Sequence, residues 1–153
     1  MKKLKAFCLI TVLFLLSGCS WQEYFILTNS SESSIMVSYT ISKVDGFAIF
    51  DETPSIYQMN NSGEIDWEKR IIIEDKDSSS LGFHFTLPAK SILILGNLTN
   101  DHYTSHNQYY INGRVFNLQM MEIKKKDGTV TIPASQFDRF FKKKNGYINY
   151  EVK

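Results

Sequence analysis

Apolar and polar side chains alternate along this chain in several short runs, a pattern typical of β-strands. In residues 34–42, one face carries the large apolar side chains of Ile35, Val37, Tyr39 and Ile41. Residues 92–95 are apolar on both faces and are predicted to form a central, covered strand. Aromatic residues make up 14% of the sequence, which also favours strands. The predicted strands are residues 24–28, 34–42, 70–74, 81–87, 91–95, 115–125, 129–132 and 147–152.

One short helix is predicted after Pro133. Ser135 is its expected N-cap, and Phe137, Phe140 and Phe141 fall on one face. The complete pattern predicts an all-β, mainly antiparallel fold, namely an immunoglobulin-like β-sandwich with one short C-terminal helix. A small β-barrel is the alternative.

The predicted sandwich has one short turn and two long connections. A polar turn separates residues 24–28 from residues 34–42, so these two strands are expected to form a hairpin. Residues 44–68 and 99–113 lack a strand pattern and are predicted to be long loops. Loops of this length are often functional.

The first 19 residues have the composition of a secretion signal. Three lysines precede an apolar run over residues 6–16, which is shorter than the roughly 20 apolar residues that span a bilayer. Leu16-Ser17-Gly18-Cys19 follows directly. The segment resembles the signal peptide of bacterial lipoproteins, whose lipobox ends in the modified cysteine. An ordinary secretory signal cleaved after Gly18 is the alternative interpretation.

The lipoprotein resemblance implies how the mature chain begins. The signal, residues 1–18, is removed, and Cys19 carries a diacylglyceryl group on its thiol and an acyl group on its amine. In Gram-negative relatives an Asp at the next position retains the protein in the inner membrane, so Ser20 favours the periplasmic face of the outer membrane. Residues 19–23 form a short tether to one domain over residues 24–153. Trp21 and Tyr24 are expected to seat this domain near the lipid.

The charge of the mature chain argues against nucleic-acid binding, and its cysteine content argues against a disulfide. The signal contains three of the 17 basic residues, so the mature chain has 14 basic and 16 acidic residues and a net charge of −2. Such a balance does not indicate a nucleic-acid partner. Cys8 leaves with the signal and Cys19 carries lipid, so no thiol remains for a disulfide.

Aromatic residues in the two predicted loops suggest a binding surface. Trp67 lies in the first loop, and Tyr103, Tyr109 and Tyr110 lie in the second. Tryptophan and tyrosine rings stack on sugars and anchor protein partners. The same rings would also serve to cover the open ends of a sandwich, and the sequence leaves both interpretations open.

A metal site is the weaker chemical hypothesis. Asp101, His102 and His106 provide a carboxylate and two imidazoles, and the four-residue spacing would place both imidazoles on one face of a helix. The polar residues around them do not favour a helix, and a third histidine is not close in sequence. Motifs of nucleophilic catalysis are also absent from the sequence. We therefore expect a protein that is not an enzyme and that uses no cofactor apart from its covalent lipid.

These observations predict a membrane-anchored binding or accessory module of the bacterial cell envelope. Its partners would be the membrane, reached through the lipid anchor, and an envelope protein contacted by the loops at 44–68 and 99–113. A receptor for a sugar or small ligand that uses the aromatic loops is one alternative. A metal-dependent hydrolase that uses Asp101, His102 and His106 is the other.

Overall fold

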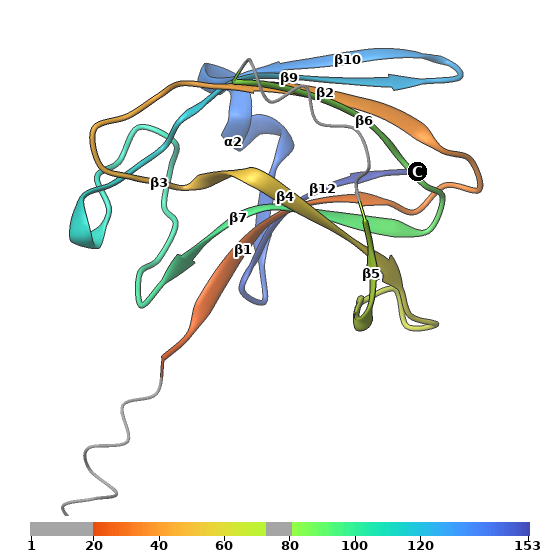
Figure 1. The fold of residues 1–153 in the computed structure, drawn as a ribbon, viewed down its shortest axis with the longest axis horizontal. Coiled ribbons are helices and arrows are strands. Elements are labelled where there is room, and N and C mark those ends of the chain that lie inside the picture. Colours follow the sequence, from red (N-terminus) through yellow and green to blue (C-terminus); the bar gives the residue numbers. More distant parts are fainter. Residues whose placement is uncertain (1–19, 73–80) are drawn as a thin grey trace, which may run out of the picture.

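The strands of the chain assemble into two sheets that pack face to face (Figure 1). The computed structural model describes residues 20–72 and 81–153. The signal and Cys19 lie outside the described residues. The strands are β1 (Gln22–Asn29), β2 (Ile35–Ile41), β3 (Phe47–Ala48), β4 (Phe50–Met59), β5 (Ile65–Ile71), β6 (Gly82–Leu87), β7 (Ser91–Thr99), β8 (Arg114–Val115), β9 (Leu118–Lys125), β10 (Gly128–Pro133), β11 (Lys142–Lys144) and β12 (Tyr147–Val152).

The order of these strands confirms the predicted β-sandwich. The large sheet has the order β11-β12-β1-β7-β4-β5, the small sheet has the order β10-β9-β2-β6, and β3 pairs with β8 in a short ribbon. Each sheet ends in two separate edge strands, so the alternative of a small barrel is not formed. Most neighbours are antiparallel, but β1 pairs with β12 in parallel, and so does β3 with β8. The first and last strands of the fold therefore lie side by side.

The predicted C-terminal helix is present and short. It consists of a 3₁₀ turn, η2 (Ala134–Gln136), and α2 (Phe137–Phe140). Ser135 is not the N-cap, because α2 begins after Gln136 and has no side-chain cap. A further 3₁₀ turn, η1 (Ile111–Gly113), precedes β8. Among the described residues, the helices lack the length and apolar content that a membrane crossing requires.

The core lies between the two sheets and is rich in aromatic rings. Strand β7 is buried along most of its length, as predicted for a central strand. At one end of the core, Phe137 of α2 is fully buried. Its ring stacks on that of Phe141 with centroids 4.2 Å apart, and it makes edge or tilted contacts with Phe25, Phe50, Tyr103 and Phe116. The helix thus closes the sandwich with apolar surface.

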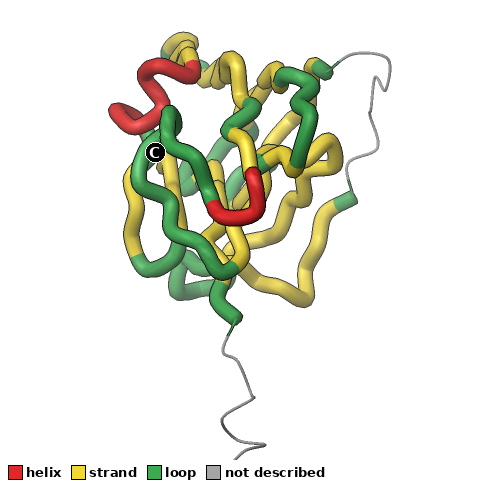
Figure 2. Tube along the Cα trace, turned by 90° about the vertical axis from the view of Figure 1, so that its left-hand side faces the viewer, coloured by secondary structure: helices red, strands yellow, loops and turns green. Residues whose placement is uncertain are grey.

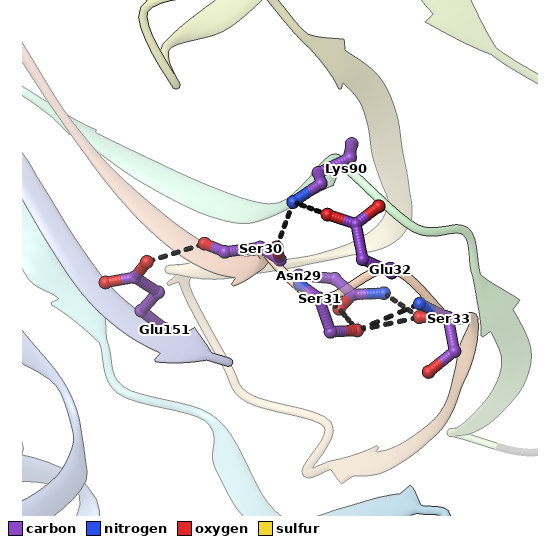
Figure 3. Close-up of polar contacts among 7 residues, drawn as sticks. All are labelled: Asn29, Ser30, Ser31, Glu32, Ser33, Lys90 and Glu151. Carbon is purple, nitrogen blue, oxygen red and sulfur yellow. Dashed lines mark hydrogen bonds and ion pairs between the residues drawn. The ribbon is translucent and has the colours of Figure 1, made fainter.

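The connection between β1 and β2 corrects the predicted hairpin. These strands lie in different sheets, and β1 pairs with β7 and β12 instead. Both faces of β1 are largely buried, which requires a place inside the large sheet. The turn between them is held by the buried side chain of Asn29 (Figure 3). Its amide oxygen accepts from the backbone N–H and the hydroxyl of Ser31, and its nitrogen donates to the oxygens of Ser33, Leu87 and Pro88.

Candidate functional site

The three residues of the predicted metal site do not converge. The Nδ1 atom of His102 lies 2.7 Å from Oε1 of Glu23, whereas Nδ1 of His106 lies 3.2 Å from Oδ2 of Asp138. The carboxylate of Asp101 accepts from the backbone N–H groups of its neighbour His102, at 2.7 Å, and of Ile111. Within residues 20–72 and 81–153, no group of three His, Cys, Asp or Glu side chains is placed to hold a metal ion. The segment is not helical, so the four-residue spacing does not bring the two imidazoles to one face.

The four aromatic residues of the predicted binding surface are also separated. Tyr103 and Tyr110 are buried, each with an exposed fraction of 6%, and their rings stack with centroids 5.9 Å apart. The hydroxyl of Tyr103 donates to Asp138 at 2.5 Å, and that of Tyr110 donates to the backbone oxygen of Ser105. Tyr109 is 97% exposed and Trp67 lies on a different strand, β5. Two of the four side chains are therefore core residues.

A buried carboxylate, Glu23 of β1, organises this end of the molecule and was not anticipated from the sequence. Its side chain is 5% exposed and lies 2.7 Å from Nζ of Lys143. The backbone N–H of Tyr103 donates to its other oxygen at 2.8 Å. Burial alone would raise the pKa of Glu23, but the hydrogen bonds from Lys143, His102 and the Tyr103 N–H outweigh it and hold the pKa below its ordinary value. Glu23 is thus charged at neutral pH and joins β1, β11 and the loop after β7.

The carboxylate of Asp138, in α2, also accepts hydrogen bonds from the loop after β7. Burial acts to raise the pKa of its carboxyl, but hydrogen bonds from the Tyr103 hydroxyl and from His106 prevail, so the pKa is lowered. Every buried side-chain nitrogen and oxygen among the described residues has a hydrogen-bond partner. The network of Glu23 and Asp138 therefore consists of mutually satisfied groups, which suits a structural role for the loop at 99–113.

A groove on the outer face of the large sheet is a candidate binding site. The β4–β5 hairpin and the β11–β12 turn both project from the face of this sheet that points away from the small sheet (Figure 1). The groove between them has a volume of about 420 Å³. It is lined by Ile26, Thr28, Ser30, Met59, Ser62, Gly63, Glu64, Ile65, Ile92, Lys144, Asn145, Tyr147, Asn149 and Glu151.

Strand alternation explains why this face is partly apolar. On β1, Phe25 and Leu27 point into the core between the sheets, so Ile26 and Thr28 point outward. Ile26 packs in a second apolar cluster with Ile65 and Ile92, which forms the floor of the groove. Large apolar residues on the outer face of a sheet require a cover, and Ile26, Ile65 and Ile92 are 4%, 7% and 2% exposed, so only a small part of their surface borders the groove.

The walls of the groove are polar and bonded in pairs. Thr28 donates its hydroxyl proton to Oδ1 of Asn149 at 3.0 Å, across the parallel pair β1–β12. Ser30, the residue after β1, donates to Oε1 of Glu151 on β12 at 2.6 Å. Glu64 and Lys144 stand on the two facing hairpins. The groove therefore offers carboxylate, amide, ammonium and hydroxyl groups above an apolar floor.

A row of four aromatic rings continues this surface. The ring of Tyr147, which lines the groove, lies 6.1 Å from that of Tyr24. Tyr24 is 5.5 Å from Trp67, and Trp67 is 5.3 Å from Tyr57. Trp67 is half exposed. Of the four aromatic residues predicted to bind a ligand, Trp67 is the one that belongs to this surface.

Sequence reasoning missed the groove although one signal was present. Residues 24–28 contain apolar side chains on both faces, which indicates that each face of this strand is covered. Residues 44–68, predicted to be a loop, instead contain β3, β4 and the start of β5.

Comparison with known proteins adds no relative, since no protein-family model, no curated protein and no solved structure matches this chain. Its function has to be inferred from its own residues.

Proposed function

We propose that this protein is a lipid-anchored, non-catalytic binding module of the bacterial cell envelope, and that the groove on the large sheet contacts its ligand or partner. The observation that carries the proposal is an apolar floor with polar walls on a sheet face that the small sheet does not cover. Its volume of about 420 Å³ lies within the usual range of binding sites.

Two further features support binding over catalysis. The groove lining contains neither a histidine nor a cysteine. The hydroxyl of Ser30 faces the carboxylate of Glu151 without an imidazole to activate it. The proposed anchor and the proposed position outside the cytoplasm rest on the lipobox resemblance of residues 16–19, and by the rule of Gram-negative relatives Ser20 favours the outer membrane.

The anchor is tested with Cys19→Ala. We expect an unacylated precursor whose mass still includes residues 1–18 and which no longer partitions with membranes in the manner of the wild type. Unchanged membrane partitioning of this variant would overturn the lipid anchor.

The groove is tested by site-specific cross-linking in native membranes. The sequence has cysteines only at positions 8 and 19, so Ser62→Cys adds a thiol at the exposed tip of the β4–β5 hairpin for a photoactivatable reagent. Thr129→Cys, exposed on β10 of the small sheet, is the matched control. We expect an envelope adduct from position 62 and none from position 129. Equal adducts at both positions, or none at position 62, would contradict the proposal.

A sugar or small-ligand receptor is the second candidate, and the aromatic row beside the groove favours it. The C–H faces of sugars stack on indole and phenol rings, while amides and carboxylates bind their hydroxyls. Trp21→Phe leaves Trp67 as the sole indole. Soluble envelope oligosaccharides should then change Trp67 fluorescence in a saturable way, and an unchanged spectrum would rule out this candidate for the glycans tested.

A further inference from the structure

Four large apolar side chains are exposed at one end of the sandwich. They are Trp21, Phe47, Tyr109 and Ile111, with exposed fractions of 46%, 68%, 97% and 59%. We call these four side chains the apolar end. They come from three segments, namely the start of β1, the β3 ribbon and the loop that leads into η1. Exposed apolar residues scattered singly are normal, whereas several on neighbouring segments form a candidate interaction surface.

Hydrogen bonds and strand pairing join these segments. The backbone of Trp21 exchanges two hydrogen bonds with Asn100, at 3.2 and 3.0 Å. The carboxylate of the next residue, Asp101, accepts from the backbone N–H of Ile111. Phe47 pairs with Arg114, three residues after Ile111. Figure 1 shows β3 and η1 at the left of the molecule and the start of β1 at its lower left, and Figure 2 shows this left-hand side facing the viewer.

The short distance in sequence between Trp21 and Cys19 indicates what this surface contacts. Trp21 lies two residues after Cys19, a separation of at most about 7 Å. If Cys19 carries lipid, the apolar end is held against the bilayer from which that lipid extends. Tryptophan and tyrosine are the residues that favour the membrane–water interface.

We propose that the apolar end rests on the lipid bilayer, with Trp21, Tyr109, Ile111 and Phe47 at the depth of the headgroups. This inference rests on the proposed lipid anchor for its occupant. The acyl chains provide most of the binding free energy, because each buried methylene contributes about 0.8 kcal/mol. The four side chains add a fixed orientation to that attachment, in which Trp67 is farther from the lipid than Trp21.

The orientation is tested by lipid quenching of tryptophan fluorescence. The whole protein is isolated from membranes, and vesicles of phosphatidylethanolamine and phosphatidylglycerol brominated close to the headgroup are added. Trp67→Phe leaves Trp21 as the sole indole, and Trp21→Phe leaves Trp67. We expect strong quenching of Trp21 and weak quenching of Trp67. Equal quenching of both indoles, or of neither, would overturn the proposal.

A pair of surface variants, made in the Trp67→Phe background, separates insertion from other roles of the apolar end. Tyr109→Ser with Ile111→Ser removes two exposed side chains and should reduce the quenching of Trp21 by at least about twofold. Met36→Ser with Met120→Ser, on the small sheet, is the matched control and should leave it unchanged. Unchanged quenching in the Tyr109 and Ile111 variant would overturn the proposal. If the Tyr109 and Ile111 variant is a monomer, the unsubstituted protein is an oligomer, and Trp21 is quenched equally in both, the apolar end contacts a second copy of this chain and the proposal is overturned.

Failure of the anchor and failure of the apolar end can be distinguished. The mass of the isolated protein reports whether Cys19 is acylated. The vesicle measurement is made in either case. If the protein has no acyl group but Trp21 is still selectively quenched, the lipid anchor is refuted and the proposed membrane contact of the apolar end is retained. If the protein is acylated but Trp21 is not selectively quenched, the lipid anchor is retained and the membrane contact is refuted.

Discussion

Asn29→Asp tests how the two sheets are joined, because it changes the hydrogen bonding of a buried side chain without changing its shape. Asn29 is fully buried. Its nitrogen donates to the backbone oxygens of Ser33, Leu87 and Pro88, at 3.0, 3.3 and 2.8 Å. A carboxylate has no proton to donate and would face the same three oxygens.

The expected loss follows from these contacts. A neutral hydrogen bond contributes about 0.5–1.5 kcal/mol to stability. The oxygen of Pro88 keeps a second donor, the hydroxyl of Ser91, which limits the penalty at that site. Burial of the negative charge of the introduced carboxylate among carbonyl oxygens increases the loss of stability further. We expect the unfolding free energy to fall by about 3 kcal/mol at pH 7, and the melting temperature by roughly 10 °C.

The same contacts determine the sign of the pH effect. Carbonyl oxygens disfavour the charged form, so the pKa of the introduced carboxyl is raised above its unfolded value of about 3.9. Once protonated, the carboxyl can donate one hydrogen bond. The deficit relative to the wild type at the same pH should therefore be largest at neutral pH and shrink as the pH falls toward the unfolded value.

Urea unfolding of both proteins at about pH 7 and pH 5 measures this deficit. Asn60→Asp is the matched control, because the oxygen of Asn60 is the atom that accepts, from the backbone N–H groups of Ser62 and Glu64 and from the Ser62 hydroxyl. A carboxylate accepts equally well, so a change within about 0.5 kcal/mol is expected there. Equal losses at both positions, or a deficit that is the same at both pH values, would refute the role assigned to Asn29.

Three other predictions concern stability, and the first has a matched control. Gly96→Ala should destabilise the fold by at least about 3 kcal/mol in urea unfolding, because its Cβ would lie 1.9 Å from the backbone oxygen of Ile49. Gly113→Ala should lose only about 1 kcal/mol, since its positive φ is strained but its surroundings are open. The lowered pKa of Glu23 means that its charged form stabilises the fold above the ordinary value of 4.5 and that this contribution is lost as the pH falls. Glu23→Gln should therefore flatten the decline of unfolding free energy between about pH 5 and pH 3, and an unchanged slope would contradict the network. Phe137→Ala should lower the unfolding free energy by about 3–5 kcal/mol, and a loss below 1 kcal/mol would contradict its place in the core.

Regular alternation made part of the fold predictable. The apolar face expected in residues 34–42 is the buried face of β2, and the run expected to be central is β7. The tight turn between β9 and β10 consists of residues 126 and 127, and Gly128 is the first residue of β10, where it pairs with Lys125. In these segments the local pattern and the tertiary packing require the same side chains on the same faces.

Other elements have no local signal. Strand β4 carries the exposed polar residues at 51–53 and a proline at position 54, and its pairing shifts register along both neighbours. Strand β11 consists of three lysines at the sheet edge, where alternation is not required. The parallel pair β1–β12 joins opposite ends of the chain, so its register depends on contacts that no short window contains. The groove depends on this pair and was therefore hidden.

Strand β1 connects the features that the two proposals use. It begins beside Trp21 at the apolar end, carries Glu23 in the buried network, and then supplies Ile26 and Thr28 to the groove. At about 3.3 Å per residue, Thr28 lies roughly 23 Å along the strand from Trp21. Because β1 lies between β7 and β12 in the large sheet, it cannot bend freely. If the apolar end rests on lipid, this strand holds the far part of the groove away from the membrane surface, where a partner can reach it.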